Sequence, residues 1–358
     1  MTVDPSFWRD RSVLVTGHTG FKGAWLSLWL QSLGAGVTGL ALPYPPTTPS
    51  LYELARVGEG MESVVCDIRD PNAVAIAVGE TRPEVVFHMA AQPLVRRSFS
   101  SPAETYETNV MGTVHLLDAV RACESVKAVV VVTSDKCYAP SSTRTPHREG
   151  DPLGGNDPYS SSKAATELVC QAYRHSFFTH PHGPRLATAR AGNVIGGGDF
   201  GEDRLLPDLF RAASTGKTLR LRNPSAVRPW QHVLSPLSGY LMLAQGLFSS
   251  PEYARGWNFG PHEQDARTVE WVVARVSDLL PGGVPWEVDA SENPPESGYL
   301  ALDSTLARER LGWSPAMGLE EGVAVTVGWQ GVFSEDGDLR GVTLAQIEGA
   351  MIARPERS

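Results

Sequence analysis

The sequence predicts an α/β fold in which a parallel sheet is covered by helices on both faces. Short apolar runs rich in valine alternate with helical stretches along the first half of the chain, beginning with Ser12–Thr16 and Ala24–Ser32. Near-continuous apolar strands separated by helices are typical of a doubly wound parallel sheet, because such strands are buried on both faces. With 358 residues, the chain is also long enough for about two domains of roughly 150 residues each.

The strands and helices of this first domain can be placed one by one. Strands are expected at Ser12–Thr16, Val37–Leu42, Ser63–Cys66, Val85–Ala90, Ala128–Thr133, Arg185–Ala189 and Trp257–Phe259. Helices are expected at Ala24–Ser32, Asn72–Glu80, Glu104–Cys123 and Tyr159–Phe178. Repeated strand–helix–strand units of this kind keep the strands parallel.

The sequence changes in character after residue 190. Glycine and proline are frequent in Gly192–Gly201, Asn223–Pro229 and Pro281–Pro295, with helical stretches between them. We therefore expect residues 1–190 to form the first domain, together with returning segments near residues 230–262. Residues 191–358 are expected to form mainly a second, smaller α/β lobe.

Composition and charge narrow the class of protein. Hydrophobic residues make up 42% of the chain and charged residues 20%, which excludes disordered and low-complexity classes. The net charge is 31 − 40 = −9, so the chain is not expected to bind nucleic acid or an anionic membrane surface. Any anionic ligand must then be held by local positive charge.

Three further features point to a cytoplasmic protein. No apolar run approaches roughly 18 residues, which excludes a membrane-spanning helix. The N-terminal residues lack the basic and apolar regions of a signal peptide. The cysteines have no metal-binding spacing and are expected to be reduced thiols, so no metal site is predicted; they are Cys66, Cys123, Cys137 and Cys170.

A glycine-rich loop follows the first strand directly. It reads Gly17-His-Thr-Gly20-Phe-Lys-Gly23 and leads into a helical run. Glycines permit the tight turn and the close approach of a pyrophosphate, which the N–H groups of a helix N-terminus can then bind. An ordinary strand–helix turn is the alternative, but the strand before and the helix after favour dinucleotide binding.

The rest of the expected dinucleotide site is less distinctive. The second strand ends in Gly39–Pro43 with no Asp or Glu to bind a ribose diol and no clear Arg for a 2′-phosphate, so these residues do not separate NAD from NADP. Asp67, followed by Ile68, either lies against the adenine or caps the next helix. Ala90 and Ala91 have small side chains that allow a cofactor to lie against the backbone.

Tyr159 and Lys163 form a Tyr-x-x-x-Lys pair at the start of a helical run. Residues four apart share a helix face, and an ammonium group beside a phenol lowers the pKa of that phenol from its usual value of roughly 10. The resulting phenolate can remove a proton from a sugar hydroxyl during hydride transfer. Alone, such a pair is usually a solvated helix face. Ser134 after a buried strand and the glycine loop make the redox interpretation much stronger.

These three elements together resemble the extended short-chain dehydrogenase/reductase family, over nearly the whole chain. The resemblance implies a Rossmann domain over residues 1–190 that binds NAD, with NADP less favoured, and a nucleotide-sugar-binding lobe over residues 191–358. It implies that Ser134 hydrogen-bonds the reacting hydroxyl and that Lys163 also binds the nicotinamide ribose. The implied cofactor contacts are Gly17, Thr19, Gly20, Phe21, Lys22, Gly23, Asp67, Ile68, Ala90, Ala91, Asn109, Thr133, Tyr159 and Lys163.

Two ionisable side chains, Asp135 and Lys136, directly follow Ser134. Sugar nucleotide 4,6-dehydratases carry Thr-Asp-Glu at the matching place, because elimination of water after C4 oxidation needs an acid and a base. We expect Asp135 to be the acid at C6 and Lys136 the base at C5, with burial and the charge of Lys163 favouring neutral Lys136. Reversed roles, or a Lys136 that only orients substrate, stay open. A turn with two solvated charges is the simplest alternative.

Longer stretches resemble the dehydratases that act on CDP-glucose. They are Thr16–Gly23, His88–Arg96, Asn109–His115, Thr133–Tyr138, Arg190–Asp199 and Arg228–Val233. This resemblance implies conversion of CDP-D-glucose to CDP-4-keto-6-deoxy-D-glucose. It also implies a set of substrate ligands, namely Gln92, Asn193, Arg204, Leu205, Arg228 and Tyr299. Arginine guanidinium groups bind phosphate oxygens through paired hydrogen bonds, and an acidic protein needs such local positive charge to hold a diphosphate.

Alternative functions stay open beside this interpretation. Asn156 and the segment Pro295–Ser297 depart from the family pattern near the expected sugar and base pocket, so another nucleotide sugar is an alternative substrate. A nucleotide-sugar 4-epimerase would have no need of Asp135 and Lys136. A cofactor-sensing regulator on the same fold would typically lose Tyr159 or Lys163.

The same family pairs two helices across a two-fold axis to form a homodimer. The corresponding helices, Glu104–Cys123 and Tyr159–Phe178, each carry an apolar stripe. The resemblance therefore implies a four-helix dimer interface, although such stripes can equally be buried within one subunit.

Overall fold

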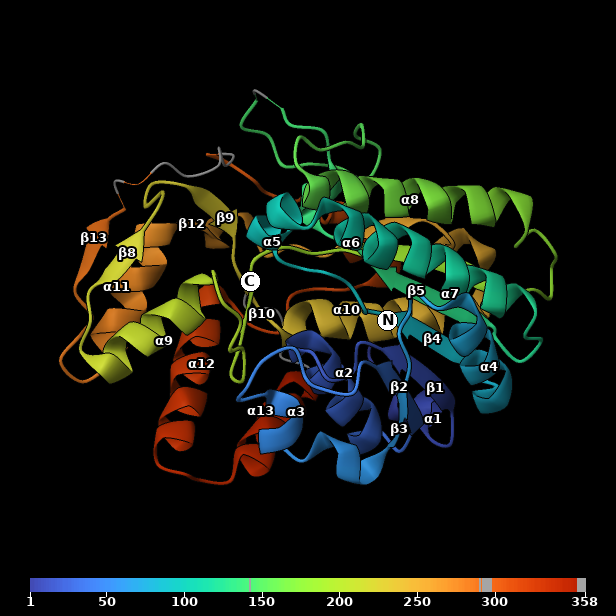
Figure 1. Ribbon diagram of the computed structural model, residues 1–358, viewed down its shortest axis with the longest axis horizontal. Helices are drawn as coiled ribbons and strands as arrows, with labels where there is room; N and C mark the ends of the chain where they lie inside the picture. Colours follow the sequence, from blue (N-terminus) through green and yellow to red (C-terminus); the bar gives the residue numbers. More distant parts are fainter. Residues whose placement is uncertain (142, 290, 292–297, 353–358) are drawn as a thin grey trace.

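A computed structural model describes residues 1–141, 143–289, 291 and 298–352. Its centre is a parallel sheet of seven strands in the order β3-β2-β1-β4-β5-β6-β11 (Figure 1). The strands are β1 Ser12–Thr16, β2 Gly36–Ala41, β3 Glu62–Val65, β4 Val85–His88, β5 Ala128–Val132, β6 Arg185–Arg190 and β11 Gly256–Asn258. Each lies within a few residues of its predicted position, so the doubly wound α/β fold is confirmed.

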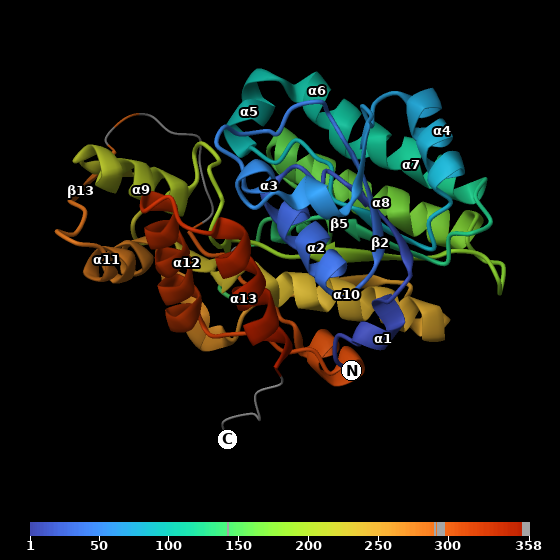
Figure 2. The ribbon, with the colours of Figure 1, turned by 90° about the horizontal axis from the view of Figure 1, so that it is seen from below.

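Helices cover both faces of this sheet because its strands are apolar on both sides. Val85 and Phe87 pack with α2 (Phe21–Ser32) and α10 (Leu234–Ser249), which lie side by side in Figure 2. Val86, between them in β4, faces the other way. It packs with α4 (Pro71–Thr81), α7 (Gly112–Arg121) and α8 (Pro158–Ser176). The strand order reverses between β1 and β4, and ligands of doubly wound sheets bind at this point, beyond the carboxyl ends of the strands.

The second lobe, which lies at the left of Figure 1, has its own hydrophobic core. Its main elements are α9 (Leu205–Thr215), β8 (Leu219–Leu221), α11 (Val269–Leu279), β13 (Trp286–Val288) and α12 (Leu319–Ser334). Short strand pairs lie beside the main sheet, namely β7 (Val194–Ile195) with β10 (Gln231–His232) and β9 (Val227–Pro229) with β12 (Ala266–Thr268). The chain returns to the first domain between these segments, where α10 packs on β5 and β6 and β11 extends the sheet.

The predicted helix Glu104–Cys123 is not one regular helix. The structure has α6 (Pro102–Tyr106), a π-helical turn at Glu107–Met111 and then α7. π-Helical turns inside helices are often found at functional sites. This one carries Asn109, whose buried side chain contacts the loop after β4.

Membrane-spanning helices and metal clusters are both absent from the described residues. None of the helices in these ranges combines the length and the apolar character needed to cross a bilayer. No group of three or more histidine, cysteine or acidic side chains in the same ranges is arranged to hold a metal ion.

Candidate active site

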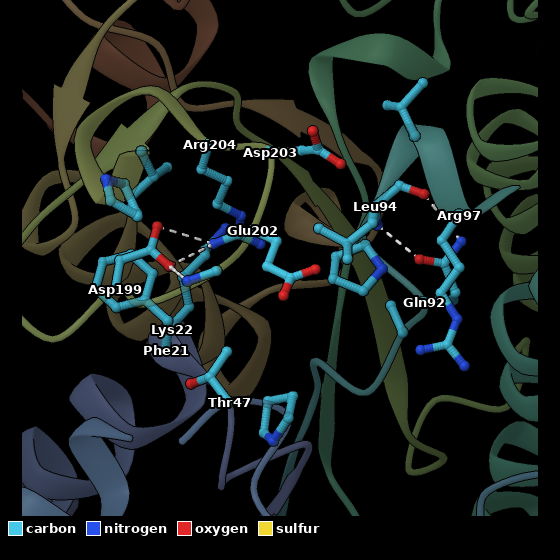
Figure 3. Close-up of a pocket in the computed structure, with 18 of the residues that line it drawn as sticks. Phe21, Lys22, Thr47, Gln92, Leu94, Arg97, Asp199, Glu202, Asp203 and Arg204 are labelled. Atoms are coloured by element: carbon cyan, nitrogen blue, oxygen red, sulfur yellow. Dashed lines mark hydrogen bonds and ion pairs between the residues drawn. The ribbon is translucent and has the colours of Figure 1, made fainter. Parts of the chain in front are cut away.

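A cavity of about 1600 Å³ lies where the carboxyl ends of the strands face the second lobe. The glycine loop, the ends of β4 and β5, the start of α8 and the segment leading into α9 all contribute to its lining. Figure 3 shows Phe21 and Lys22 on one side of it, and Gln92, Leu94 and Arg97 on another. Asp199 and Arg204 approach from the second lobe. Most of the residues named as site residues from the sequence therefore meet at one place; Asn109 and Tyr299 do not line the cavity.

The glycine loop is shaped for close backbone approach. A Cβ on Gly17, which has φ +74°, would lie 2.8 Å from the backbone of Ala90, and a Cβ on Gly23 would lie 2.2 Å from the carbonyl oxygen of Gly17. Gly20 precedes α2 without a side-chain cap, so the N–H groups of the first helical turn stay available to an anion. This cradle fits the pyrophosphate of NAD.

Three side chains of the glycine loop, Thr19, Phe21 and Lys22, also line the cavity. The Lys22 Nζ donates to the Tyr240 hydroxyl at 3.1 Å. Burial, together with the charges of Lys163 and Arg204, lowers the pKa of Lys22 to about 7. Lys22 therefore places a titratable amine in the buried part of the cavity.

The alternative that Asp67 caps the next helix is wrong. The N-cap of α4 is Asp70, whose carboxylate accepts from the N–H groups of Asn72 and Ala73. Asp67 instead pairs with Arg69 at 2.6 Å and lines the cavity beside Ile68. Arg69 therefore engages the carboxylate of Asp67, and the contact of Asp67 with the adenine stays a prediction.

Ala90 and Ala91 line the cavity as expected, and the hydroxyl of Thr16 fixes the start of this segment. Thr16 Oγ1 accepts from the N–H groups of Met89 and Ala90, both at 3.1 Å. Met89 and Ala90 are therefore bound to the end of β1 instead of continuing β4, which ends at His88.

Two predicted ligands, Gln92 and Asn109, use their side chains within the protein. The Asn109 amide bonds the Gln92 backbone and the Ser162 hydroxyl, and Asn109 does not line the cavity. The Gln92 amide bonds Leu94 and Thr105, so although Gln92 lines the cavity its polar atoms are already engaged. Both amides therefore shape the loop that borders the cavity, and a direct contact of either residue with a ligand stays a prediction.

The structure places Tyr159 and Lys163 in the cavity on the first turns of α8. The helix begins at Pro158 because Asp157 forms a capping box with Ser160, accepting from its N–H at 2.9 Å. Tyr159 and Lys163 are both buried, and Lys163 Nζ donates to the carbonyl oxygen of Val132 at 3.4 Å.

The expected lowering of the Tyr159 pKa is not found. Burial raises the pKa of Tyr159 to about 12, and hydrogen bonding from Ser134 and the charge of Arg204 offset this only in part. Burial also lowers the pKa of Lys163 to about 8, although the charge of Glu167 opposes that shift. For Tyr159, burial therefore outweighs the hydrogen bond with Ser134 and the charge of Arg204.

Ser134, Asp135 and Lys136 form a tight turn at the end of β5. Ser134 Oγ caps the short 3₁₀-helix at Asp135–Cys137 and donates to Asp135 Oδ1 at 2.9 Å. Asp135 is buried and its Oδ2 atom has no partner among the described residues. Gly192 makes room for it, since a Cβ there would lie 1.8 Å from Asp135 Oδ2. Lys136 lines the cavity but is only half-buried, so the predicted burial of its amine is wrong.

The second lobe supplies the remaining predicted ligands. Arg204 pairs with Asp199 at 3.0 Å, and Leu205 and Asn193 line the cavity beside them. Arg228 is buried on β9 and also lines the cavity. Tyr299 pairs with β9 through its backbone but does not line the cavity, so its predicted ligand role is not supported by its position.

Sequence reasoning missed several cations of this lobe. They line the cavity and are Arg211, Lys217, Arg220 and Arg222. A signal was present, because Arg204 and Arg211 are seven residues apart across α9 and Arg220 and Arg222 are two apart at β8. These spacings place each pair on one face of its element. Asn156 is exposed, and residues 295–297 lie outside the described ranges.

Known proteins resemble this chain over most of its length. Residues 14–326 match the family described as GDP-mannose 4,6 dehydratase. A CDP-glucose 4,6-dehydratase from Salmonella typhimurium is 50% identical over 332 residues, covering 91% of this chain and 92% of that protein. A dTDP-glucose 4,6-dehydratase from Xanthomonas campestris pv. campestris is 29% identical over 335 residues, covering 88% of this chain and 92% of that protein.

Solved structures show the same fold. The UDP-glucose 4-epimerase of Thermus thermophilus, solved in complex with NAD, is 28% identical to this chain and superimposes with a TM-score of 0.74. The match covers 88% of this chain and 97% of that one.

Proposed function

Because the chain belongs to the GDP-mannose 4,6 dehydratase family, we propose that it is an NAD-dependent hydro-lyase acting on CDP-D-glucose. The products are CDP-4-keto-6-deoxy-D-glucose and water. The relative that is 50% identical supports the choice of substrate. The observation that carries the reaction type is the buried Ser134–Asp135 pair in the same cavity as Tyr159 and Lys163.

Tyr159 is the base for the C4 hydroxyl in this proposal, and Ser134 positions that hydroxyl. NAD, held by the glycine loop, supplies the hydride acceptor and the positive charge of its oxidised ring. Because the pKa of Tyr159 is about 12 in the structure, proton removal requires added positive charge. Arg204 contributes such charge in the structure, and in this proposal Lys163, four residues along the same helix face, adds to it together with the oxidised ring of NAD.

Asp135 and Lys136 carry out the elimination. Lys136 accepts the proton from C5, the C6–O bond breaks, and Asp135 supplies the proton that lets the hydroxyl leave as water. The hydride that NAD would take from C4 would then return to C6, and Lys136 would return the proton to C5, which gives the 6-deoxy product and restores the oxidised cofactor. The buried Asp135 Oδ2 has no partner among the described residues, so it is available to carry that proton.

Arg228, Arg204 and Asn193 bind the nucleotide diphosphate in this proposal. All three line the lobe side of the cavity. Arg211 and Arg222, which were not named from the sequence, also line it there. An acidic protein needs such a concentration of positive charge to hold a diphosphate.

The proposed activity is tested by incubating the NAD-loaded protein with CDP-, dTDP-, UDP- and GDP-glucose. The 4-keto product absorbs in alkali, and CDP-glucose is expected to give the fastest increase. A faster increase with another nucleotide would overturn the choice of substrate. Conversion to a 4-epimer that keeps its C6 hydroxyl would overturn the dehydratase reaction itself.

One variant tests whether Lys136 takes part in the elimination. Lys136→Met is expected to lose about 10²–10⁴-fold in water release, as is typical when a general base is removed. C4 oxidation is expected to persist, and the absorbance of bound NADH measures it. Release of water at the parental rate would reject Lys136 as the base.

We further propose a cytoplasmic homodimer and the division of the chain given from the sequence, with residues 1–190 binding NAD and residues 191–358 mainly binding the nucleotide sugar. Apolar side chains stay exposed on α8 and before α7, and they include Tyr106, Met111, Leu168 and Phe177. A second subunit would cover them in a four-helix interface. Light scattering that gives a mass of 38.6 kDa would reject the dimer.

A further inference from the structure

The turn Ser134–Lys136 is attached on both sides to a single buried ion pair. On its N-terminal side, Thr133 Oγ1 donates to Glu167 Oε1 at 2.5 Å. On its C-terminal side, the hydroxyl of Tyr138 accepts from Arg190 Nη1 at 2.7 Å. Glu167 and Arg190 bind each other, so the two ends of the turn are joined through one pair of charges.

The pair itself is fixed by its geometry and surroundings. Arg190 donates to Glu167 through two parallel bonds, Nε to Oε1 at 3.0 Å and Nη2 to Oε2 at 2.8 Å. The two side chains are only 5% and 1% exposed. Such a two-point contact between planar groups fixes orientation as well as distance, and at this burial it is hardly weakened by solvent.

Three secondary-structure elements meet at this pair. Glu167 lies on α8, one turn after Lys163, and Arg190 ends β6. The hydroxyl of Tyr138 donates in turn to Asn258 Oδ1 at 2.7 Å, which ties the turn to β11. The ion pair therefore connects α8, which carries Tyr159, to the turn that carries Asp135.

The segment after Arg190 completes this support. Gly192, two residues further on, has no side chain, and the Asp135 carboxylate occupies the space that a Cβ would need. A shift of β6 relative to β5 would therefore move Asp135 as well as Thr133. Catalytic groups lose activity when displaced by about 1 Å, which makes such support important for the reaction.

We propose that Glu167 and Arg190 are positioning residues that hold Ser134, Asp135 and Lys136 in place for elimination. The inference rests on the proposed dehydratase function. Glu167 and Arg190 are therefore expected to contribute to kcat, because they hold the turn in place, as well as to folding. Neither side chain lines the cavity.

Two threonines provide a matched pair of variants for this proposal. Thr133 and Thr188 both donate a hydroxyl hydrogen bond to Glu167, at 2.5 and 2.7 Å, and both are buried. Only Thr133 is adjacent to Ser134, whereas Thr188 lies within β6. Valine replaces each hydroxyl by a methyl group of similar size.

The experiment compares both valine variants as full-length enzyme with CDP-glucose at saturating NAD, because Thr133 also lines the cavity and weaker cofactor binding must not limit the rate. Thr133→Val is expected to lose roughly tenfold or more in kcat with KM nearly unchanged, because a displaced turn affects the chemical step. Thr188→Val is expected to stay close to the parental kcat. Thr133→Ser, which restores the hydroxyl, is expected to recover most of the lost activity.

Equal effects of the two valine variants would overturn the inference, and so would no effect of either. If Thr133→Val fails to fold, Tyr138→Phe decides the question from the other side of the turn. An unchanged kcat in Tyr138→Phe then rejects the inference, and a lowered kcat with unchanged KM supports it. A parental enzyme that dehydrates no nucleotide sugar would reject the proposed function, and the inference with it.

Discussion

The sheet side and the lobe side of the cavity differ in how firmly their polar groups are held. On the sheet side Asp135 and Lys163 are 2% and 5% exposed, and hydrogen bonds within the domain fix the surrounding turn and helix. On the lobe side Arg228 is also buried, but the side chains of Arg211 and Arg220 are 46% and 72% exposed. Charges interact strongly where water is excluded and weakly where solvent screens them.

This difference separates two kinds of function. Groups that move protons need fixed positions and perturbed acidity, which burial provides. Groups that bind a flexible nucleotide diphosphate need positive charge and tolerate some freedom. Substitutions on the sheet side are therefore expected to lower kcat, and those on the lobe side to raise KM.

The largest effect is expected from Tyr159→Phe on the sheet side. Removing a proton-transfer group costs about 10²–10⁴-fold in kcat. Tyr173→Phe on the same helix is the matched control, because its hydroxyl bonds Asp118 at the surface. Steady-state rates of both variants test this, and normal turnover by the Tyr159 variant would remove the basis of the proposed mechanism.

A methyl group in the glycine loop is the next largest perturbation. A Cβ on Gly23 would lie 2.2 Å from the Gly17 carbonyl oxygen, so Gly23→Ala forces a backbone shift. Overpacking costs about 1–3 kcal/mol, equivalent to roughly 5–150-fold weaker NAD binding if it acts on the bound form. Fluorescence titration with NADH measures the change in cofactor affinity.

Gly79→Ala is the control for the glycine-loop variant. Nothing lies within 4 Å of a Cβ at Gly79, which is in α4. The variant is expected to gain about 0.5–1 kcal/mol in unfolding free energy, since alanine favours helix over glycine. Equal loss of cofactor binding in both variants would show that the cradle has no special role.

Arg228→Met tests the lobe side. Loss of a hydrogen bond to a charged group costs about 1.5–3 kcal/mol, which predicts roughly 10–150-fold higher KM for CDP-glucose. The value of kcat is expected to change little, because the reacting groups lie on the other side. Arg275→Met, which breaks only the surface pair with Glu320, is expected to leave KM unchanged. A fall in kcat alone for Arg228→Met would contradict the comparison.

The pH dependence arises on the sheet side, and its effect is small at neutral pH and grows above pH 8. Lys163 has a pKa of about 8, lowered by burial, so its ammonium is present below pH 8 and lost as the pH rises through that value. If the ammonium is required, kcat/KM falls about tenfold per pH unit above pH 8. Lys22 titrates near pH 7 in the same cavity, so the assignment needs a second variant.

The variant Glu167→Gln tests whether Lys163 is the group that causes the alkaline fall in kcat/KM. The charge of Glu167 raises the pKa of Lys163, so its removal is expected to move the alkaline fall in kcat/KM to lower pH. A pH–rate profile between about pH 6 and 10 measures the shift. An unmoved profile would show that Lys163 does not control this limb.

Much of the site followed from local sequence patterns. The glycine loop, the Ser134–Lys136 turn and the Tyr159–Lys163 pair each follow a strand or begin a helix, and parallel strands bring these ends to one edge. The sequence did not predict that the side-chain amides of Asn109 and Gln92 bond other groups of the protein. Whether such amides face a ligand or each other depends on the π-helical turn before α7, which no pattern in the sequence indicated.

The sequence by itself determined the doubly wound sheet, because runs such as Val85–His88 are apolar on both faces and must be covered on both. It also determined which side chains gather at the carboxyl edge. Only the tertiary structure decided how far each is buried, and hence that the Tyr159 pKa rises while Lys136 stays half-exposed. Burial depends on residues distant in the chain that pack together, so no local pattern contains it.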